Sequence, residues 1–236
     1  MTDDTPPRRK QRPILATLLV LALLPIGGVL IHALVPPPMT LLMLREAAGG
    51  QGIDYRWRSL DDISPNLIAS AIAAEDARFC THGGFDMEAI EKALANNARS
   101  AEAGGRKVRG GSTISQQTAK NIFLWPGRDW IRKGLEAGYT VLIETIWSKR
   151  RIMEVYLNVA EMGPGVYGAE AAARHWYGKS AADLSPREAA RIAAILPSPR
   201  RYDAGTPGPY VRRRASRVQA SARVVRNEGL ASCVLG

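Results

Sequence analysis

One uncharged stretch near the N-terminus most constrains how this chain can fold. Residues 14–35 contain no Asp, Glu, Lys or Arg, and a helix of that length can cross the ~30 Å hydrocarbon core of a bilayer. Four basic residues stand before it: Arg8, Arg9, Lys10 and Arg12. The sequence therefore predicts a cytoplasmic tail at 1–13, a transmembrane anchor at 14–35, and a remainder that faces outward. A cleavable signal peptide is the alternative, which the long run and the lack of an A-x-A site disfavour.

The residues after this run are expected to form a hydrophobic connector and then a domain. Residues 36–52 begin with three prolines and are rich in Leu and Met. They are either a linker helix or a segment lying in the outer leaflet. Ile53, Tyr55 and Trp57 alternate with polar residues, which predicts a short strand. We expect a single domain over 53–236.

The net charge indicates the kind of ligand that the chain can bind, and the cysteine content indicates whether disulfides or zinc sites are expected. Lys and Arg outnumber Asp and Glu by 32 to 22, a net charge of +10. This balance suits a polyanion, which can be an anionic lipid, a pyrophosphate or a nucleic acid. Cys80 and Cys233 are the two cysteines, and we expect two free thiols, with one bridge as the alternative. The spacing of Cys and His predicts no zinc site.

A first block of residues, EDARFCTHGGF at 75–85, follows a helix that Ser64 and Pro65 open. The helical spacing places Glu75 and Phe79 on the apolar face of Ile68 and Ile72. A carboxylate on such a face should have a raised pKa, as a general base near neutrality needs. A buried carboxylate paired with an arginine is the alternative. Asp76 lies about 100° away on the helix, so we expect it to matter less than Glu75.

A second block, GGSTISQQTAKN at 110–121, combines a Gly-Gly turn with a helix start. Ser112 and Thr113 can cap that helix, and exposed backbone N–H groups at a helix N-terminus favour anions. The preceding residues 96–111 are small, polar and basic, which predicts a loop. Four cations follow within 14 residues of one another and could clamp a pyrophosphate: Lys120, Arg128, Arg132 and Lys133.

The rest of the chain is dominated by helical patterns. We expect helices over 132–147, with Glu136 directed inward, and over 148–158, 170–177 and 185–196, and a loop over 163–168. The arginine-rich C-terminal stretch is interpreted as a solvated or lipid-facing helix. Few strands are expected.

These motifs resemble those of the family 51 glycosyltransferases over residues 60–199. The five matching blocks are EDARFCTHGGF, GGSTISQQTAKN, RKGLE at 132–136, KRRIMEVYLN at 149–158 and GPGVYGAEAAARHWYGKS at 163–180. The resemblance implies a mainly α, lysozyme-like glycosyltransferase domain with one N-terminal transmembrane helix. It also implies polymerisation of lipid II into peptidoglycan with inversion, a β-1,4 bond and release of undecaprenyl diphosphate. Because only 37 residues follow Pro199, the monofunctional type is expected.

The same resemblance assigns roles to individual residues. It implies that Glu75 is the general base, that Lys120 and Arg128 stabilise the pyrophosphate, and that Glu136 is a second essential glutamate on the phosphate or metal side. The residues expected to bind substrate are Asp76, Phe79, His82, Ser112, Thr113, Gln116, Gln117, Lys120, Asn121, Arg128, Arg132 and Lys133. No organic cofactor is expected. A divalent cation, Mg²⁺ or Mn²⁺, is an option within the family.

The expected partners are lipid II, the growing lipid-linked glycan and membrane lipids, with no nucleic acid. The expected location is the inner membrane, in a single pass, with the catalytic domain in the periplasm. Two other functions stay open. A lysozyme-like hydrolase would share the fold and a glutamate but leaves the basic cluster unexplained. An anchored scaffold that holds anionic lipid or cell-wall polymer needs no inward-facing Glu75.

Overall fold

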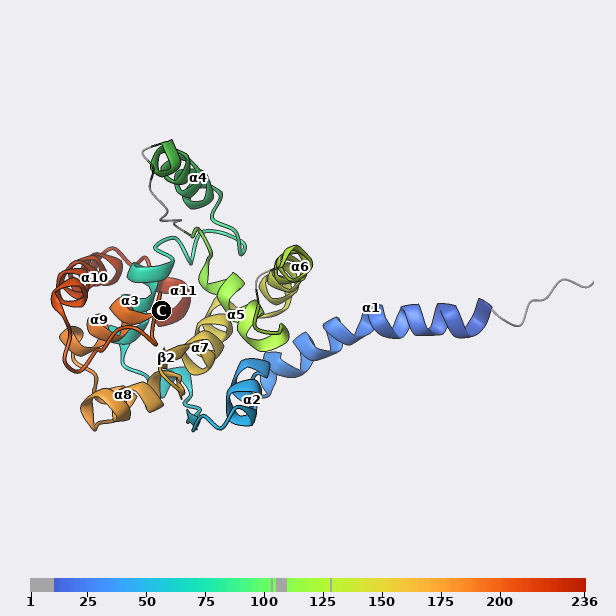
Figure 1. Ribbon diagram of the computed structural model, residues 1–236, viewed down its shortest axis with the longest axis horizontal. Coiled ribbons are helices and arrows are strands. Elements are labelled where there is room, and N and C mark those ends of the chain that lie inside the picture. The colour runs from blue at the N-terminus through green and yellow to red at the C-terminus, as the bar shows by residue number, and fades with distance from the viewer. Residues whose placement is uncertain (1–10, 103, 105–109, 128) are drawn as a thin grey trace, which may run out of the picture.

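The computed structural model describes residues 11–102, 104, 110–127 and 129–236, and side chains from residue 23 onward. Within them the chain is mainly helical (Figure 1), as expected. The helices are α1 (Gln11–Leu34), α2 (Leu41–Ala48), α3 (Pro65–Glu75), α4 (Met87–Glu102), α5 (Ile114–Phe123), α6 (Trp130–Ile146), α7 (Lys149–Val159), α8 (Ala169–Tyr177), α9 (Pro186–Ile195), α10 (Pro209–Asn227) and α11 (Ser232–Leu235). The strands are β1 (Asp54–Tyr55), β2 (Glu161–Gly163) and β3 (Val166–Tyr167). Two short 3₁₀ helices lie at Leu60–Asp62 and Ala181–Asp183.

The helices α3, α5, α7 and α9 each begin directly after a Ser or Thr residue that caps the helix N-terminus. Ser64 caps α3 and Ser148 caps α7, each by accepting a hydrogen bond from a backbone N–H of the first turn. Thr113 and Ser185 cap α5 and α9 and form full capping boxes with the residue three positions later. Such caps satisfy backbone donors that have no partner inside the helix. These four expected helix starts are confirmed.

Two helical groups enclose the core. α3, α9 and α10 pack together on one side, and α5, α6 and α7 on the other. The most buried side chains include those of Tyr156, Tyr167 and Phe79. The small sheet has the order β1-β3-β2, with β1 parallel and β2 antiparallel to β3. The expected strand at 53–57 is therefore present as β1. The expected loop at 163–168 is wrong in part, because β2 and β3 form a hairpin there.

α1 projects from the helical body, and its C-terminal end packs on α6. Among the residues described, no helix combines the length and the apolar character needed to cross a membrane. Trp147 donates its indole N–H to the Val29 carbonyl at 2.8 Å. Arg151 donates to the His32 carbonyl from Nε at 3.1 Å and from Nη2 at 3.0 Å. Because Pro36 has no N–H, the helix itself offers the His32 carbonyl no i+4 donor.

The connector contains a helix. α2 begins at a capping box between Thr40 and Met43, and Met43 is fully buried. The Glu46 carboxylate pairs with Arg200 at 3.1 Å. Residues 41–48 of the connector therefore form a helix, and a position of this segment in the outer leaflet stays a prediction.

Three expectations about the chain are wrong. Cys80 and Cys233 form a disulfide, although they are 153 positions apart and nothing local indicates that they meet. Residues 96–102, expected in a loop, belong to α4, because their Ala, Asn and Glu content permits continuation of the helix. α3 ends at Glu75, with Asp76 as its C-cap at φ −160° and ψ 75°. Phe79 therefore does not share a helical face with Glu75.

Glu170 of α8 is a buried carboxylate that connects α8 to Arg58, which follows β1, and to the 3₁₀ helix at Ala181–Asp183. Its side chain is fully buried. It accepts hydrogen bonds from the Ala181 N–H at 2.9 Å, from Arg58 Nη2 at 3.1 Å and from Arg174 Nε at 2.7 Å. Burial favours the neutral acid, but these donors outweigh it and lower the pKa of Glu170 from 4.5 to about 2.

We expect Glu170→Gln to lower the free energy of unfolding at pH 7 by about 3 kcal/mol, because the folded-state shift of the pKa corresponds to that amount. The depressed pKa contributes stability that is fully present above about pH 4.5 and is lost as the pH falls toward 2. Urea unfolding of both proteins between pH 7 and pH 2 tests this. Parallel pH dependences of the two proteins would contradict it.

Candidate active site

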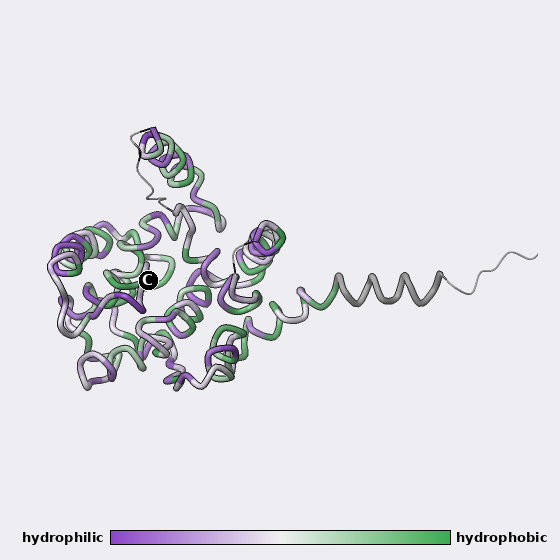
Figure 2. The backbone as a smooth tube through the Cα atoms, in the orientation of Figure 1, coloured by the Kyte–Doolittle hydropathy of each residue, from purple (hydrophilic) through white to green (hydrophobic). Residues whose placement is uncertain are grey.

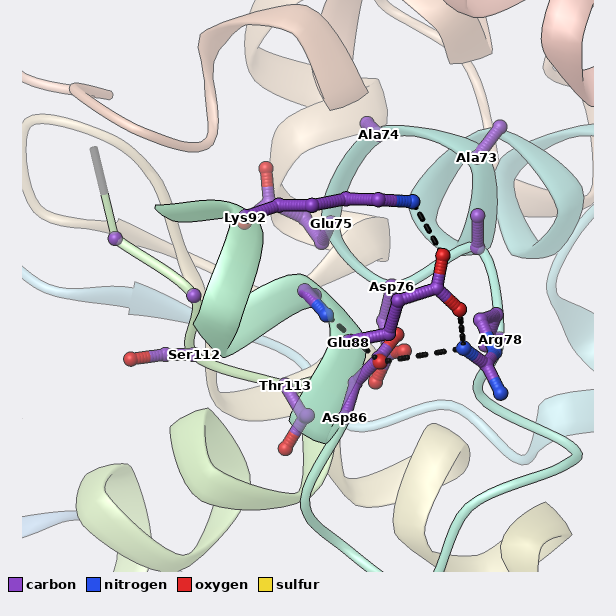
Figure 3. Close-up of a pocket in the computed structure, with 14 residues that line it drawn as sticks. Ala73, Ala74, Glu75, Asp76, Arg78, Asp86, Glu88, Lys92, Ser112 and Thr113 are labelled. Atoms are coloured by element: carbon purple, nitrogen blue, oxygen red, sulfur yellow. Dashed lines mark hydrogen bonds and ion pairs between the residues drawn. The ribbon is translucent and has the colours of Figure 1, made fainter. Parts of the chain in front are cut away.

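A cavity of about 360 Å³ lies where α3 ends, between that end and the N-terminal part of α4. Glu75, Asp76 and Arg78 line one wall (Figure 3), and Gly110–Thr113 line the other. Glycine is favoured at position 111, because a Cβ there would lie in tight contact, 3.2 Å from the Ile90 Cα of α4. The two sequence blocks therefore meet at one cavity, with a backbone turn on one side and carboxylates on the other.

Glu75 is held at the edge of this cavity by two side chains. Its side chain is 12 % exposed. Gln117 of α5 donates from Nε2 to Oε2 at 3.0 Å, and Arg214 Nη2 of α10 lies 3.5 Å from Oε1. Burial raises the pKa of the Glu75 carboxyl above its usual range, and the hydrogen bond from Gln117 and the charge of Arg214 offset this only in part. The Glu75 carboxylate is therefore desolvated, as expected of a general base, and it is also close to an arginine, as the alternative expected.

Asp76 points away from Glu75 into a buried network. His82 Nε2 lies 2.8 Å from Asp76 Oδ1, and the backbone N–H of Ile114 donates to Asp76 Oδ2 at 3.0 Å. The backbone N–H of Gly84 donates to His82 Nδ1 at 3.1 Å. Because Nδ1 accepts, Nε2 carries the proton of the neutral ring and donates it to Asp76. This pair ties the first block to the start of α5.

Ion pairs close the rim of the cavity on the α4 side. Glu88 pairs with both Arg78 and Lys92, and Arg78 Nη1 lies 3.7 Å from Asp86 Oδ1 (Figure 3). Arg78, Glu88 and Lys92 are exposed at this rim, so their pairs contribute little stability. The sequence analysis selected none of these four residues, because charged side chains at ordinary spacing carry no local signal of a cavity.

The basic cluster lies on α5 and α6. Burial lowers the pKa of the Lys120 ammonium, and the carboxylate of Glu136 opposes that shift. Glu136 is buried and pairs with Arg132 at 3.3 Å and also with Lys133. Arg132 Nε is buried and has no hydrogen-bond partner within the described part of the chain. A buried guanidinium donor that is left unused is well suited to an incoming anion.

Two further cavities adjoin these cations. One, of about 170 Å³, is lined by Lys120, Asn121 and Arg132. The other, of about 230 Å³, is lined by Ser112, Gln116 and Lys133 together with residues of α4. Eight of the residues expected to bind substrate line one of these three cavities: Asp76, Ser112, Thr113, Gln116, Lys120, Asn121, Arg132 and Lys133. His82 and Gln117 line none of the three. Phe79 is fully buried and lines none of the three. Arg128 lies outside the described residues, as do Lys107 and Arg109.

Across the described ranges, no group of three or more His, Cys, Asp or Glu side chains is arranged to hold a metal ion. Both oxygens of Glu136 are engaged by Arg132 and Lys133. The divalent cation stays a prediction.

Arg214 is a site residue that sequence reasoning missed. It is one of six arginines on α10, whose hydrophilic character is visible along the tube in Figure 2. The sequence holds a partial signal. Val211, Ala215 and Val218 mark the buried face of α10, and Arg214 is adjacent to that face. Periodicity cannot show that the face packs on α3 near Glu75.

Comparison with known proteins identifies the family of the chain. A family model described as "Transglycosylase" matches residues 43–223. A protein named "Biosynthetic peptidoglycan transglycosylase" from Caulobacter vibrioides is 55 % identical over 221 residues, which cover 94 % of each chain. A protein of that name from Rhodospirillum centenum is 54 % identical over 228 residues, 96 % of each chain. A third, from Xanthomonas campestris pv. campestris, is 52 % identical over 234 residues, 95 % of this chain and 93 % of the relative. The chain belongs to the transglycosylase family.

Proposed function

We propose that this chain polymerises lipid II into the glycan strands of peptidoglycan and releases undecaprenyl diphosphate. The relatives carry the name of that activity, and membership of their family supports glycan polymerisation in cell-wall synthesis. The main structural support for a general base is the desolvated carboxylate of Glu75, which Gln117 and Arg214 hold at the cavity edge.

The proposed reaction forms one glycosidic bond and breaks one bond between the donor sugar and its diphosphate. Glu75 takes the proton from the 4-hydroxyl of the acceptor sugar, and that oxygen attacks the anomeric carbon of the donor. The bond from that carbon to the diphosphate breaks on the opposite side, which inverts the configuration. Glycosidases use a second carboxyl group to protonate the leaving group. Diphosphate already leaves as an anion, so preorganised cations can replace that acid.

Lys120, Arg132 and Lys133 are the described cations suited to that task, and Arg128 joins them by resemblance. Glu136 neutralises part of their charge and fixes Arg132 and Lys133 through its two oxygens. We propose that Glu136 acts by positioning these cations. The unused Nε donor of Arg132 supports an anion at this place.

The purified full-length protein should convert lipid II into long glycan. Resolving the products by gel electrophoresis measures this, because polymer, unreacted substrate and short fragments migrate differently. Breakdown of preformed glycan without synthesis would instead identify a hydrolase. Failure to change either substrate would identify a scaffold, and both of these results contradict the proposal.

We further propose that residues 14–35 anchor the chain in the inner membrane with the domain in the periplasm. The uncharged run and its basic N-terminal flank support this orientation. The Cys80–Cys233 disulfide supports it independently, because structural disulfides persist in oxidising compartments.

A reporter protein that is active only outside the cytoplasm should be active when it is fused after Gly236. Alkaline phosphatase and green fluorescent protein form a matched pair, since the first requires export and the second fluoresces when made in the cytoplasm. We expect phosphatase activity in the membrane fraction. A fluorescent fusion, or a protein released to the soluble fraction, would contradict the topology.

A further inference from the structure

The segment between α3 and α4 is supported unequally along its length. It carries the Asp76–His82 pair, and residues 76–86 contain no helix or strand. α3, which precedes it, is deeply buried, with Leu67 through Ile72 all in the core. α4, which follows it, has no buried residue. The segment is therefore fixed where it leaves α3 and at its own buried Phe79 side chain, whereas α4 adds no buried residue after it.

A disulfide supplies support in the middle of this segment. Cys80 is bonded to Cys233 on α11, at a sequence separation of 153. α11 is itself firmly placed: Val234 is 1 % exposed, and Arg150 Nη1 donates to the Val234 carbonyl at 2.7 Å. α11 packs on α7. The disulfide thus connects the segment to the core through α11.

α7 also contacts the segment directly. Lys149 donates from Nζ to the His82 carbonyl at 2.7 Å, and its ammonium lies 4.6 Å from the centre of the Phe79 ring. Two consecutive residues of α7 therefore fix the segment by different routes. Lys149 contacts it directly, and Arg150 holds α11, to which the segment is covalently bonded.

The contacts continue from this segment to Glu75. His82 donates to Asp76, Asp76 accepts from the Ile114 N–H at the first residue of α5, and Gln117 of α5 donates to Glu75. Each link is a hydrogen bond of 3.0 Å or less. A shift of the segment around Cys80 would therefore change where α5 presents Gln117 to the carboxylate.

We propose that Cys80 and Cys233 are positioning residues of the active site, and that their disulfide sets the geometry of the Asp76–His82 pair and of Gln117 for the transfer reaction. This inference rests on the proposed function. The disulfide forms when the two thiols lose two protons and two electrons to a protein dithiol–disulfide oxidant, which leaves as its dithiol. Reduction by an external thiol reverses the step. Full turnover then requires the oxidised form.

The test compares one protein in two redox states. The full-length wild-type enzyme is reduced with dithiothreitol, its thiols are counted, and kcat and KM for lipid II are measured before and after reoxidation. We expect two free thiols after reduction and a fall in kcat of roughly tenfold to a hundredfold, the size that misplacement of catalytic groups produces. KM should change less than about twofold, because the substrate-binding cations lie elsewhere. Reoxidation should restore kcat.

The double variant Cys80→Ser/Cys233→Ser is the matched control. We expect it to show the reduced enzyme's low kcat with and without dithiothreitol. This variant also tests the inference if dithiothreitol does not reduce the disulfide in the folded protein. The inference would be overturned if the double variant had the kcat of the oxidised wild type. It would also be overturned if the wild type kept that kcat after reduction had freed two thiols. A wild type that makes no glycan would instead overturn the proposed function.

Amide hydrogen exchange separates positioning from a general effect on the fold. If the bridge positions the segment, exchange should accelerate at residues 78–86 and at Ile114, while the amides of α7 and α9 stay protected. Accelerated exchange throughout α7 and α9 would mean that the bridge only stabilises the whole domain, and this result would also overturn the inference.

Discussion

Glu75→Gln should reduce glycan synthesis by at least the ~10²–10⁴-fold that a general base contributes. Glutamine keeps the shape of the side chain and can still accept from Gln117, but it cannot take the acceptor's proton. The variant should still bind lipid II or a substrate-like phosphoglycolipid. Turnover and ligand binding measured on the same folded protein check both statements.

A matched control for this substitution is Glu91→Gln. It makes the same chemical change on α4 at an exposed position, and we expect near wild-type turnover. The pH profile gives a second readout. The base works only when deprotonated, so activity should rise with pH through the Glu75 pKa, which burial places above the usual range. Near wild-type synthesis by the Glu75→Gln variant would refute the mechanism.

Lys120→Ala should lower the rate of glycan synthesis by about 10²–10³-fold, the cost of removing one preorganised charge contact to a developing anion. The ammonium is largely withdrawn from water, so its charge acts through a less screened environment. Single-turnover rates with saturating lipid II isolate this effect from binding.

Arg213→Ala is the comparison for that substitution, because it removes a positive charge from an exposed position of α10. We expect its rate to stay close to that of the wild type. Circular dichroism should show that both variants are folded. Equal rates for Lys120→Ala and wild type would mean that the ammonium is only solvated.

Local chemistry made much of the fold predictable. The caps at Thr113, Ser148 and Ser185 depend on residues within three positions of one another, and all three are observed. The two blocks could also be placed at one site, because Glu75 and the Gly110–Gly111 turn carry recognisable chemistry. Helix ends were harder to place. α3 stops at Glu75 because the Asp76 side chain bonds His82 and Ile114, and Ile114 lies far along the chain.

The remaining features depend on tertiary contacts that no spacing reveals. Arg214 reaches Glu75 from a helix more than a hundred positions later, and Cys233 reaches Cys80 across a similar gap. Asp76 illustrates the functional consequence. Its direction on the helix suggested a minor role, but its two oxygens each accept one hydrogen bond. An Asn there would turn an NH₂ group toward one of those two donors, so Asp76→Asn should matter more than the sequence indicates.

The end of α1 has a consequence for how the protein must be handled. Trp147 and Arg151 donate to carbonyls of its last turns, and an arginine there also complements the negative end of the helix dipole. A chain trimmed before residue 36 would leave the Trp147 indole N–H without this acceptor and would expose the apolar surface that covers Val29. The end of α1 is thus a structural part of the helical body, and the full-length protein, not a fragment that lacks α1, is the proper material for measuring stability.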